Sequence, residues 1–376
     1  MKSSFNGARL KVARQYNTLT IGEVAERIGV STQAVSQFEN NKTEPKTENL
    51  FQIVNLLGFP KEFYFEEDKA DIKVGATYFR SMASTSKKVQ KSQIEKVKLL
   101  GTIYSCIEKF IDFPQFNLRC SSMSDLENLA QEVREQWELG DGPIPNIIDV
   151  MERNGVVISS TFEENDKIDA YSQVWMMGRK AVPLVVLGHE KNFFRQQFNA
   201  AHELGHIITD GVYDIEEMSK LDYRNMENQM NYFAGALLIP KKRYLNDLCS
   251  RRRTDYQFYL ELKMKYKVSA AALVVRANQL GAINANQYQY IMKQRSIKGY
   301  IKEEPYDKEI LTFKPRYLKQ AMKMIIHDNK ISGDDFMDEL GISLSKSMVE
   351  KLLGLDEGYL GCNGKEAPIA LFCNQA

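Results

Sequence analysis

Phe-Asn-Ala-Ala-His-Glu-Leu-Gly-His, at residues 198–206, contains the pattern His-Glu-x-x-His. On a helix, side chains four residues apart lie one turn above each other on one face, so His202 and His206 can hold one metal ion together. Glu203 lies beside them and is placed to act as a base without being a ligand, which is the arrangement of zinc peptidases. The alternative is a buried helix whose histidines make ordinary hydrogen bonds. Two of the four histidines in the chain fall in this pattern, which favours the metal site.

A catalytic zinc site needs a third protein ligand and one position left open for water. No histidine follows the motif at the spacing His-x-x-Gly-x-x-His, so a carboxylate is the expected third ligand. The candidates are Asp210, Asp214, Glu216, Glu217, Asp222 and Glu227. Asp210 continues the same helix by one turn, and three ligands in line along one helix suit a tetrahedron poorly. The stretch 211–222 is a charged segment, where carboxylates are most often solvated.

Glu227 begins a further expected helix, which Pro240 ends. The apolar residues in register with this glutamate are Met230, Phe233, Ala234, Leu237 and Leu238. A carboxylate on a buried face is costly without a partner, and a metal would supply that partner. Glu227 is therefore the preferred third ligand, with Zn²⁺ as the metal.

The composition is that of an ordinary soluble globular protein, and 376 residues favour two or three domains. A net charge of +1 gives no overall attraction to nucleic acid, so any DNA contact must come from a local patch. Five scattered cysteines favour reduced thiols over disulfides or a thiolate zinc site. The N-terminus lacks the apolar core of a signal peptide, and no apolar run approaches the length of a membrane span. A cytoplasmic protein without a membrane partner is expected.

Residues 1–70 are expected to form an all-helical unit. Thr20 begins a helix with Glu23 as its capping-box partner, and Gly29 ends that helix in the left-handed conformation. Ser31 caps the next helix, and two short helices joined by a tight glycine turn form the helix-turn-helix pattern. The other two helices of this unit are expected at 9–15 and 47–57.

The second helix of this pair would enter the major groove of double-stranded DNA. Glutamine can pair with adenine, small hydroxyls can reach bases or phosphates, and polar residues after the helix suit phosphate contacts. The expected DNA contacts are Thr32, Gln33, Ser36, Gln37, Asn40 and Lys42. The alternative is a helical module that binds protein.

The middle of the chain is expected to contain three more helices. They cover 92–110, 124–137 and 143–154, and the second opens with a possible capping box between Ser124 and Glu127. The first could be a connector helix or a dimer helix, which makes a homodimer one expectation.

The periodicity then changes to that of strands. Apolar, β-branched runs that indicate a small antiparallel sheet lie at 155–160, 171–176 and 182–187. Residues 183–187 are the candidate edge strand that would bind a substrate backbone by adding a strand. The alternative is that they form a plain core strand.

The segments 19–25 (LTIGEVA), 28–31 (IGVS) and 35–40 (VSQFEN) resemble the XRE family of phage-repressor-type domains. Two positions depart from that pattern. Ile21 stands where the family usually has a glutamine that contacts DNA. Asn41 replaces a usual glycine, and asparagine can still adopt a left-handed turn.

Three further stretches carry motifs of a known kind: 195–206, RQQFNAAHELGH; 227–234, ENQMNYFA; and 237–240, LLIP. Together they resemble the ImmA/IrrE metallopeptidase family. The resemblance implies that Glu227 is the third zinc ligand and that the reaction is peptide hydrolysis, with Glu203 as the base. The departures are Gln229, Met230 and Asp210, where glutamate, alanine and histidine are common. None of them removes a ligand or the base.

The expected fold class is α+β and mostly helical. The expected ranges are an XRE-type helix-turn-helix domain at 1–70, a helical connector at 71–125, a gluzincin-like peptidase domain at 126–295 and a helical C-terminal region at 296–376. The peptidase domain would hold the small sheet and the His-Glu-x-x-His helix. Within it, residues 268–276 resemble a second helix-turn-helix half that completes the fold.

The resemblance implies a DNA-binding transcriptional regulator with a zinc-dependent endopeptidase domain. Its protein substrate would be a repressor or an antitoxin-like protein, in control of mobile elements, stress response or phage defence. One alternative is a DNA-binding repressor or antitoxin that cleaves nothing and whose zinc site is structural or sensory. Another is a toxin–antitoxin component that acts through protein contact. The intact Glu203 favours the enzyme, because a purely structural site has no use for a base.

Overall fold

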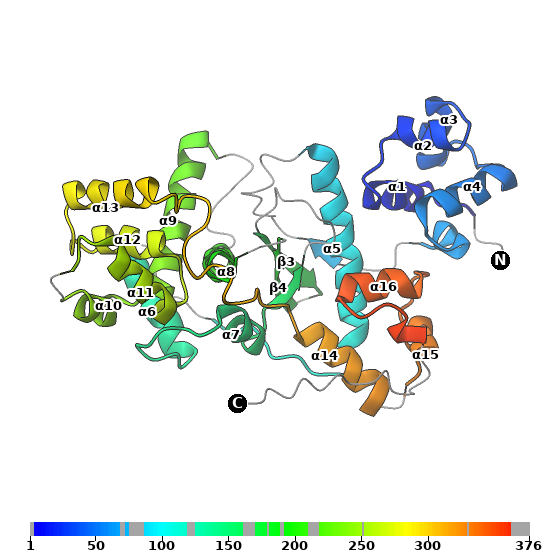
Figure 1. The fold of residues 1–376 in the computed structure, drawn as a ribbon. Helices are drawn as coiled ribbons and strands as arrows, with labels where there is room; N and C mark the ends of the chain where they lie inside the picture. The colour runs from blue at the N-terminus through cyan, green and yellow to red at the C-terminus, as the bar shows by residue number, and fades with distance from the viewer. Residues whose placement is uncertain are drawn as a thin grey trace. The chain divides into compact units, whose positions relative to one another are not determined.

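The structure, a computed structural model, describes residues 4–67, 72–74, 86–118, 125–160, 170–178, 180–188, 192–209, 218–249, 252–328 and 331–361. Figure 1 shows the helices and strands along the chain. By its internal contacts the chain divides into two units. The first consists of Met1–Lys73, Ser84–Phe113 and Arg316–Ala376, and the second of Val74–Ala83 and Pro114–Pro315. The fold class is α+β and mostly helical, as predicted.

The first unit begins with a small helical domain. Its elements are α1 (Gly7–Tyr16), α2 (Ile21–Arg27), α3 (Thr32–Glu39), α4 (Thr47–Leu57) and the 3-10 helix η1 (Lys61–Phe65). The predicted capping box of α2 is present: Thr20 Oγ1 accepts the Glu23 N–H at 3.2 Å, and the Glu23 carboxylate accepts the Thr20 N–H at 2.6 Å. Ser31 caps α3 as predicted. Gly29 and Gly58 follow α2 and α4 with left-handed φ angles of 69° and 71°.

The contact between α1 and α3 depends on a buried ion pair and on a glycine. Arg14 Nε lies 2.5 Å from Glu39 Oε1, and Arg14 Nη2 donates to Glu39 Oε2 at 2.9 Å. The N–H of Gly7 donates to Asn41 Oδ1 at 2.6 Å, and Asn41 has the left-handed φ of 54° that its sequence position predicts. A Cβ on Gly7 would lie 2.0 Å from the carbonyl oxygen of Phe38, so only glycine fits there.

The rest of the first unit comes from two distant parts of the chain. Its elements are α5 (Lys87–Ile107), α14 (Tyr317–Lys323), the π-helical turn η3 (Met324–Asp328), α15 (Gly333–Glu339), α16 (Lys346–Leu353) and the 3-10 helix η4 (Tyr359–Gly361). Helices α14 and α16 contact α5 (Figure 1). Lys109 Nζ of this unit donates to the Glu339 carbonyl at 3.0 Å, and the Ser343 N–H donates to Glu66 Oε1 at 2.9 Å. From Arg316 onward, the predicted C-terminal region thus shares a unit with the helix-turn-helix helices, whereas the four predicted ranges remain a prediction.

Helix α5 begins more than one turn before the predicted range 92–110 and ends earlier. The apolar spacing gave no sign of its first turn, because polar bonds hold that turn on the N-terminal domain. Lys88 Nζ donates to both carboxylate oxygens of Glu23 at 2.8 Å, and Ser92 Oγ donates to the Tyr16 carbonyl at 2.8 Å. Mainly because of the hydrogen bond from Lys88, the pKa of Glu23 falls from 4.5 to about 2, so this carboxylate stays charged at neutral pH.

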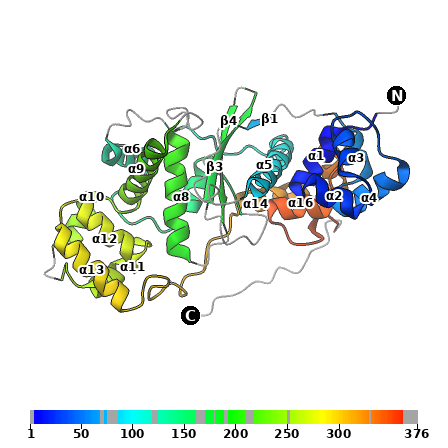
Figure 2. The same ribbon diagram turned by 90° about the horizontal axis from the view of Figure 1, so that it is seen from above.

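The second unit is built in layers around one helix. Its helices are α6 (Leu126–Gln136), α7 (Ile147–Arg153), α8 (Phe193–Ile208), α9 (Lys220–Leu238), α10 (Lys241–Asp247), α11 (Tyr256–Tyr266), α12 (Ala270–Gln279) and α13 (Ala285–Ile297). Helix α8 contacts the sheet on one side and α9 on the other, and α6 packs on α9 (Figure 2). The core of this unit is continuous from α6 through α8 and α9 to α13.

The start of α6 differs from the prediction. Asp125 caps the helix, because its Oδ1 accepts the N–H groups of Glu127 and Asn128 at 3.0 and 3.1 Å. The predicted capping box between Ser124 and Glu127 is therefore wrong, and Ser124 lies outside the described residues. The Glu127 carboxylate instead accepts two bonds from Arg276 Nη2, at 2.6 and 2.7 Å.

The sheet has the strand order β1-β3-β4-β2. Its strands are β1 (Ile72–Val74), β2 (Val157–Ser160), β3 (Ala170–Met177) and β4 (Lys180–Leu187). Strands β3 and β4 are antiparallel, but β2 pairs with β4 in parallel, so the predicted all-antiparallel sheet is wrong. Strand β4 lies between β3 and β2. Because β4 runs antiparallel to β3 and parallel to β2, the sheet is mixed.

The prediction of an edge strand at 183–187 is also wrong, because these residues lie in the central strand β4. Pro183 is unusual in a central strand, since proline is usually confined to sheet edges. It is accommodated because pairing with β2 starts only at the next residue, where Leu184 lies opposite Val157.

No described helix is long and apolar enough to cross a membrane.

We expect Gly7→Ala to destabilise the first unit by about 3 kcal/mol or more, because the added Cβ would overlap backbone atoms at the end of α3. The matched control is Gly22→Ala in α2, whose Cβ would meet its nearest atom at 3.7 Å. Urea unfolding followed by circular dichroism measures both. Equal unfolding midpoints for the two variants would contradict the close approach of α1 and α3.

Candidate metal centre

Helix α8 carries the His-Glu-x-x-His motif in its last turns. Asn192 caps its N-terminus by accepting the N–H groups of Phe194 and Arg195 at 2.8 and 3.3 Å. The helix is buried almost throughout, because the sheet covers one face and α9 covers another. The predicted helix and its buried setting are both present.

The position of α9 depends on Gly205 within the motif. A Cβ on Gly205 would lie 2.9 Å from Met230 Sδ and 3.0 Å from Phe233 Cδ1, both on α9. Glycine therefore lets α9 approach α8 closely. Glu227, one turn before Met230, is thereby brought to the two histidines.

Three side-chain donors converge on one point. The Nε2 atoms of His202 and His206 are 3.1 Å apart, and they lie 3.4 and 3.3 Å from Glu227 Oε2 and Oε1. Among the described residues they form a group of potential metal ligands, and all three are buried. A tetrahedral Zn²⁺ with bonds of about 2.0–2.1 Å holds neighbouring ligand atoms about 3.3 Å apart. Two imidazole nitrogens and a carboxylate at these distances fit zinc, with one position left for another ligand.

The electrostatics of the cluster also suit a cation. Burial alone would raise the pKa of Glu227, but hydrogen bonds and charge interactions with His202 and His206 outweigh it and lower the pKa from 4.5 to about 2. Glu227 is therefore present as a carboxylate, the form that ligates metal. A buried carboxylate facing two ring nitrogens requires a positive charge between them, either a proton or a metal ion.

Asn231 orients one of the histidines. Its Oδ1 lies 3.2 Å from His202 Nδ1, so the Nδ1–H can donate to the amide and leave Nε2 to bind metal. The sequence reasoning missed this residue, although a signal existed. Asn231 follows Glu227 by four residues and so lies one turn along the same face of α9.

Glu203 lies outside the donor cluster, as the prediction requires of a base. It is 2% exposed, and its Oε2 accepts a hydrogen bond of 2.7 Å from Ser172 Oγ on β3. The sequence reasoning missed Ser172 as well, and no local signal could have found it. Only the packing of β3 on α8 brings this serine to the motif.

The other third-ligand candidates are less well placed or lie outside the described residues. Asp222 is exposed and accepts the Ser219 hydroxyl at the start of α9. The candidates outside the described residues are Asp210, Asp214, Glu216 and Glu217. Of the two remaining departures from the family motif, Met230 is buried in the core and Gln229 is exposed.

Comparison with known families divides the chain in the same way as the motifs. Residues 10–63 match the helix-turn-helix family, and residues 152–278 match a peptidase family described as the IrrE N-terminal-like domain. The chain joins an XRE-type helix-turn-helix domain to an IrrE-like domain. No match was found among curated proteins. The second match runs from α7 to α12 and contains the three clustered donors and Glu203, whereas α5 lies outside both matches.

In the helix-turn-helix domain, the predicted DNA contacts gather on and just after α3. Thr32, Gln33, Asn40 and Lys42 are exposed, and Ser36 and Gln37 are partly exposed. Val35 and Phe38 on the opposite face are buried. Helix α3 therefore presents one polar face to a partner, which is the arrangement of a recognition helix.

For the zinc that the IrrE-like donor set fits, we expect Asn231→Ala to weaken affinity about 10- to 100-fold, because His202 loses the group that orients its ring. Competition with a chromophoric chelator measures this affinity. The matched control is Asn228→Ala, an exposed asparagine on the same helix. Equal zinc affinity in both variants would show that Asn231 does not orient the ligand.

Proposed function

We propose that the chain is a DNA-binding regulator whose IrrE-like domain is a zinc-dependent endopeptidase. The observation that supports it best is the convergence of His202, His206 and Glu227 at distances that fit zinc, with Glu203 buried beside them and outside the donor set. Such a set, with an open position and a separate base, is the arrangement used for hydrolysis.

Zinc, when bound, would polarise the scissile carbonyl and acidify a water molecule. Glu203 takes the proton from the attacking water as the water oxygen bonds to the carbonyl carbon. It returns the proton to the amine nitrogen as the C–N bond breaks. The hydrogen bond from Ser172 holds Oε2 of this carboxylate and leaves Oε1 for the proton. Ser172 is in this scheme a positioning residue.

The proposed substrate is a repressor or an antitoxin-like protein. The helix-turn-helix domain supports this, because it would hold the peptidase at DNA, where such proteins act. The corresponding role is control of mobile elements, stress response or phage defence. The alternative is a repressor or antitoxin that cleaves nothing and uses the metal for structure or sensing. Glu203 speaks against it, because a structural site has no need of a buried carboxylate that is not a ligand.

We expect Glu203→Gln to retain zinc and to lose peptide cleavage by about 10²- to 10⁴-fold, because the amide cannot take up a proton. The full chain is expressed with the repressors encoded beside its gene, fragments are sought by mass spectrometry, and zinc is measured by atomic emission. Glu309→Gln, at an exposed position of the same unit, is the matched control. Identical fragments from wild type and Glu203→Gln, with zinc bound in both, would refute the peptidase.

We expect Gln33→Ala to weaken binding to the operator by about 5- to 150-fold, the effect of losing one good base contact, and to leave binding to unrelated duplex unchanged. Fluorescence anisotropy with the gene's own upstream DNA measures this. Gln52→Ala, exposed on α4, is the matched control. If the wild-type chain binds no DNA even at low salt, the DNA-binding proposal fails.

A further inference from the structure

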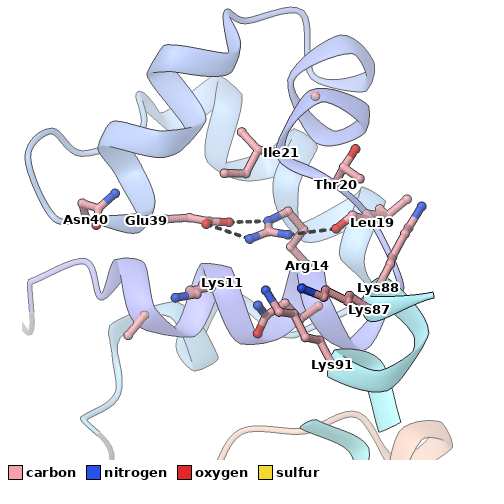
Figure 3. Close-up of a pocket in the computed structure, with 13 residues that line it drawn as sticks. Lys11, Arg14, Leu19, Thr20, Ile21, Glu39, Asn40, Lys87, Lys88 and Lys91 are labelled. Atoms are coloured by element: carbon pink, nitrogen blue, oxygen red, sulfur yellow. Dashed lines mark hydrogen bonds and ion pairs between the residues drawn. The ribbon is translucent and has the colours of Figure 1, made fainter. Parts of the chain in front are cut away.

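A cleft of about 740 Å³ opens in the first unit between the helix-turn-helix domain and the first turn of α5. Its walls come from α1, the start of α2, the end of α3 and α5. In Figure 3, Lys11, Lys87 and Lys91 lie on one side of the cleft and Thr20 and Ile21 on the other. The part of the wall that α5 contributes has no role in the proposed function, since α5 lies outside the matched helix-turn-helix family.

The cleft carries a concentration of positive charge. The Arg14 guanidinium and the Glu39 carboxylate in its centre neutralise each other. Lys11, Lys87 and Lys91 are exposed, and none of them forms an ion pair with another described residue. These three charges lie together in a chain whose net charge is only +1. A local basic patch of this kind attracts polyanions.

The α5 lysines are held in place by the fold. Lys88, which lies between them, donates two hydrogen bonds of 2.8 Å to the Glu23 carboxylate of α2. Ser92 donates a hydrogen bond to the Tyr16 carbonyl at the end of α1. Residues 87 and 91 lie one helical turn apart and so share a face. The stretch of helix that carries these two lysines is therefore held beside the start of α2, which lowers the entropy cost of bringing them to a ligand.

The cleft lies where the backbone of bound DNA would pass. In helix-turn-helix docking the second helix of the pair enters the major groove, and the first crosses the phosphate backbone. The cleft is lined by Thr20 and Ile21 at the start of α2 and by Asn40 just after α3. The side chain of Ile21 cannot donate a hydrogen bond to phosphate. The basic groups across the cleft can supply the contact that this isoleucine does not.

We propose that α5 is a second DNA-contacting element, in which Lys87 and Lys91, together with Lys11 of α1, bind phosphates of the strand beside α2. The proposal rests on the proposed DNA binding of the domain and adds contacts from α5, which lies outside the matched residues 10–63. Because phosphate contacts are independent of sequence, these lysines increase affinity for any duplex and leave specificity to α3.

The test compares the full-length double variant Lys87→Gln/Lys91→Gln with the wild type. Binding to the gene's upstream duplex and to an unrelated duplex is measured by anisotropy from about 50 to about 200 mM KCl. We expect the slope of log Kd against log salt to fall by about 2, one for each lost phosphate contact, with affinity reduced roughly tenfold or more on both duplexes. Lys61→Gln/Lys351→Gln removes the same charge from exposed positions of the same unit outside the cleft and should leave the slope unchanged.

A double variant with the slope and affinity of the wild type would overturn this proposal while leaving the DNA binding of α3 intact. Absence of DNA binding by the wild type would instead overturn both. The same variants are titrated with inorganic phosphate and with a nucleoside triphosphate. Tight binding of either by the wild type, lost in the double variant without a change in the DNA slope, would assign the cleft to a small anion and contradict the role of α5.

Discussion

The close approach of α9 to α8 is the constraint on which the metal centre depends. Two histidines on α8 supply only part of the candidate zinc site, and the third potential donor, Glu227, belongs to another helix. Gly205 removes the side chain that would keep the helices apart, so that Met230 and Phe233 pack directly on the motif helix. Metal–ligand distances tolerate deviations of only about 0.2 Å, so this packing contact is part of the site although it touches no metal.

Polar contacts play the corresponding part in the first unit. The first turn of α5 is held by Lys88 and Ser92, and the end of α3 is held on α1 by Arg14, Glu39 and Asn41. Hydrogen bonds and ion pairs therefore hold in place both α3, which carries the polar face, and the start of α5, which carries the lysines. In the IrrE-like domain, apolar packing fixes the positions of the helices that carry the site. In the helix-turn-helix domain, specific hydrogen bonds do much of this work.

The local parts of the fold could be predicted from the sequence. The caps at Thr20 and Ser31, the glycine turn at Gly29 and the helix that carries His202 and His206 depend on residues within one or two turns, and the structure contains them all. Glu227 could be predicted as the third ligand because the apolar residues of its own helix lie on the same face as this glutamate. Its convergence with the histidines is present in the structure, whereas its role as a ligand stays a prediction.

What the sequence did not predict depends on contacts between distant segments. The parallel pairing of β2 with β4 follows from which side of the hairpin β2 occupies, and strand composition does not encode that side. Ser172 meets Glu203 across 31 positions of the chain, and the first turn of α5 is held by residues 65 and 76 positions away. The edge position predicted for residues 183–187 is wrong for the same reason, because pairing with β2 makes β4 a central strand.

The first unit is discontinuous: the chain leaves it after Phe113 and returns at Arg316. Helices α14 and α16 pack on α5, and Ser343 donates hydrogen bonds to the Glu66 carboxylate. A single break anywhere in Pro114–Pro315 would therefore cut the polypeptide without separating its ends, because the two fragments would still share the folded core of the first unit. Electrophoresis under denaturing conditions would show two pieces, whereas gel filtration would show one particle. For this chain, an intact native mass is no sign of an intact backbone.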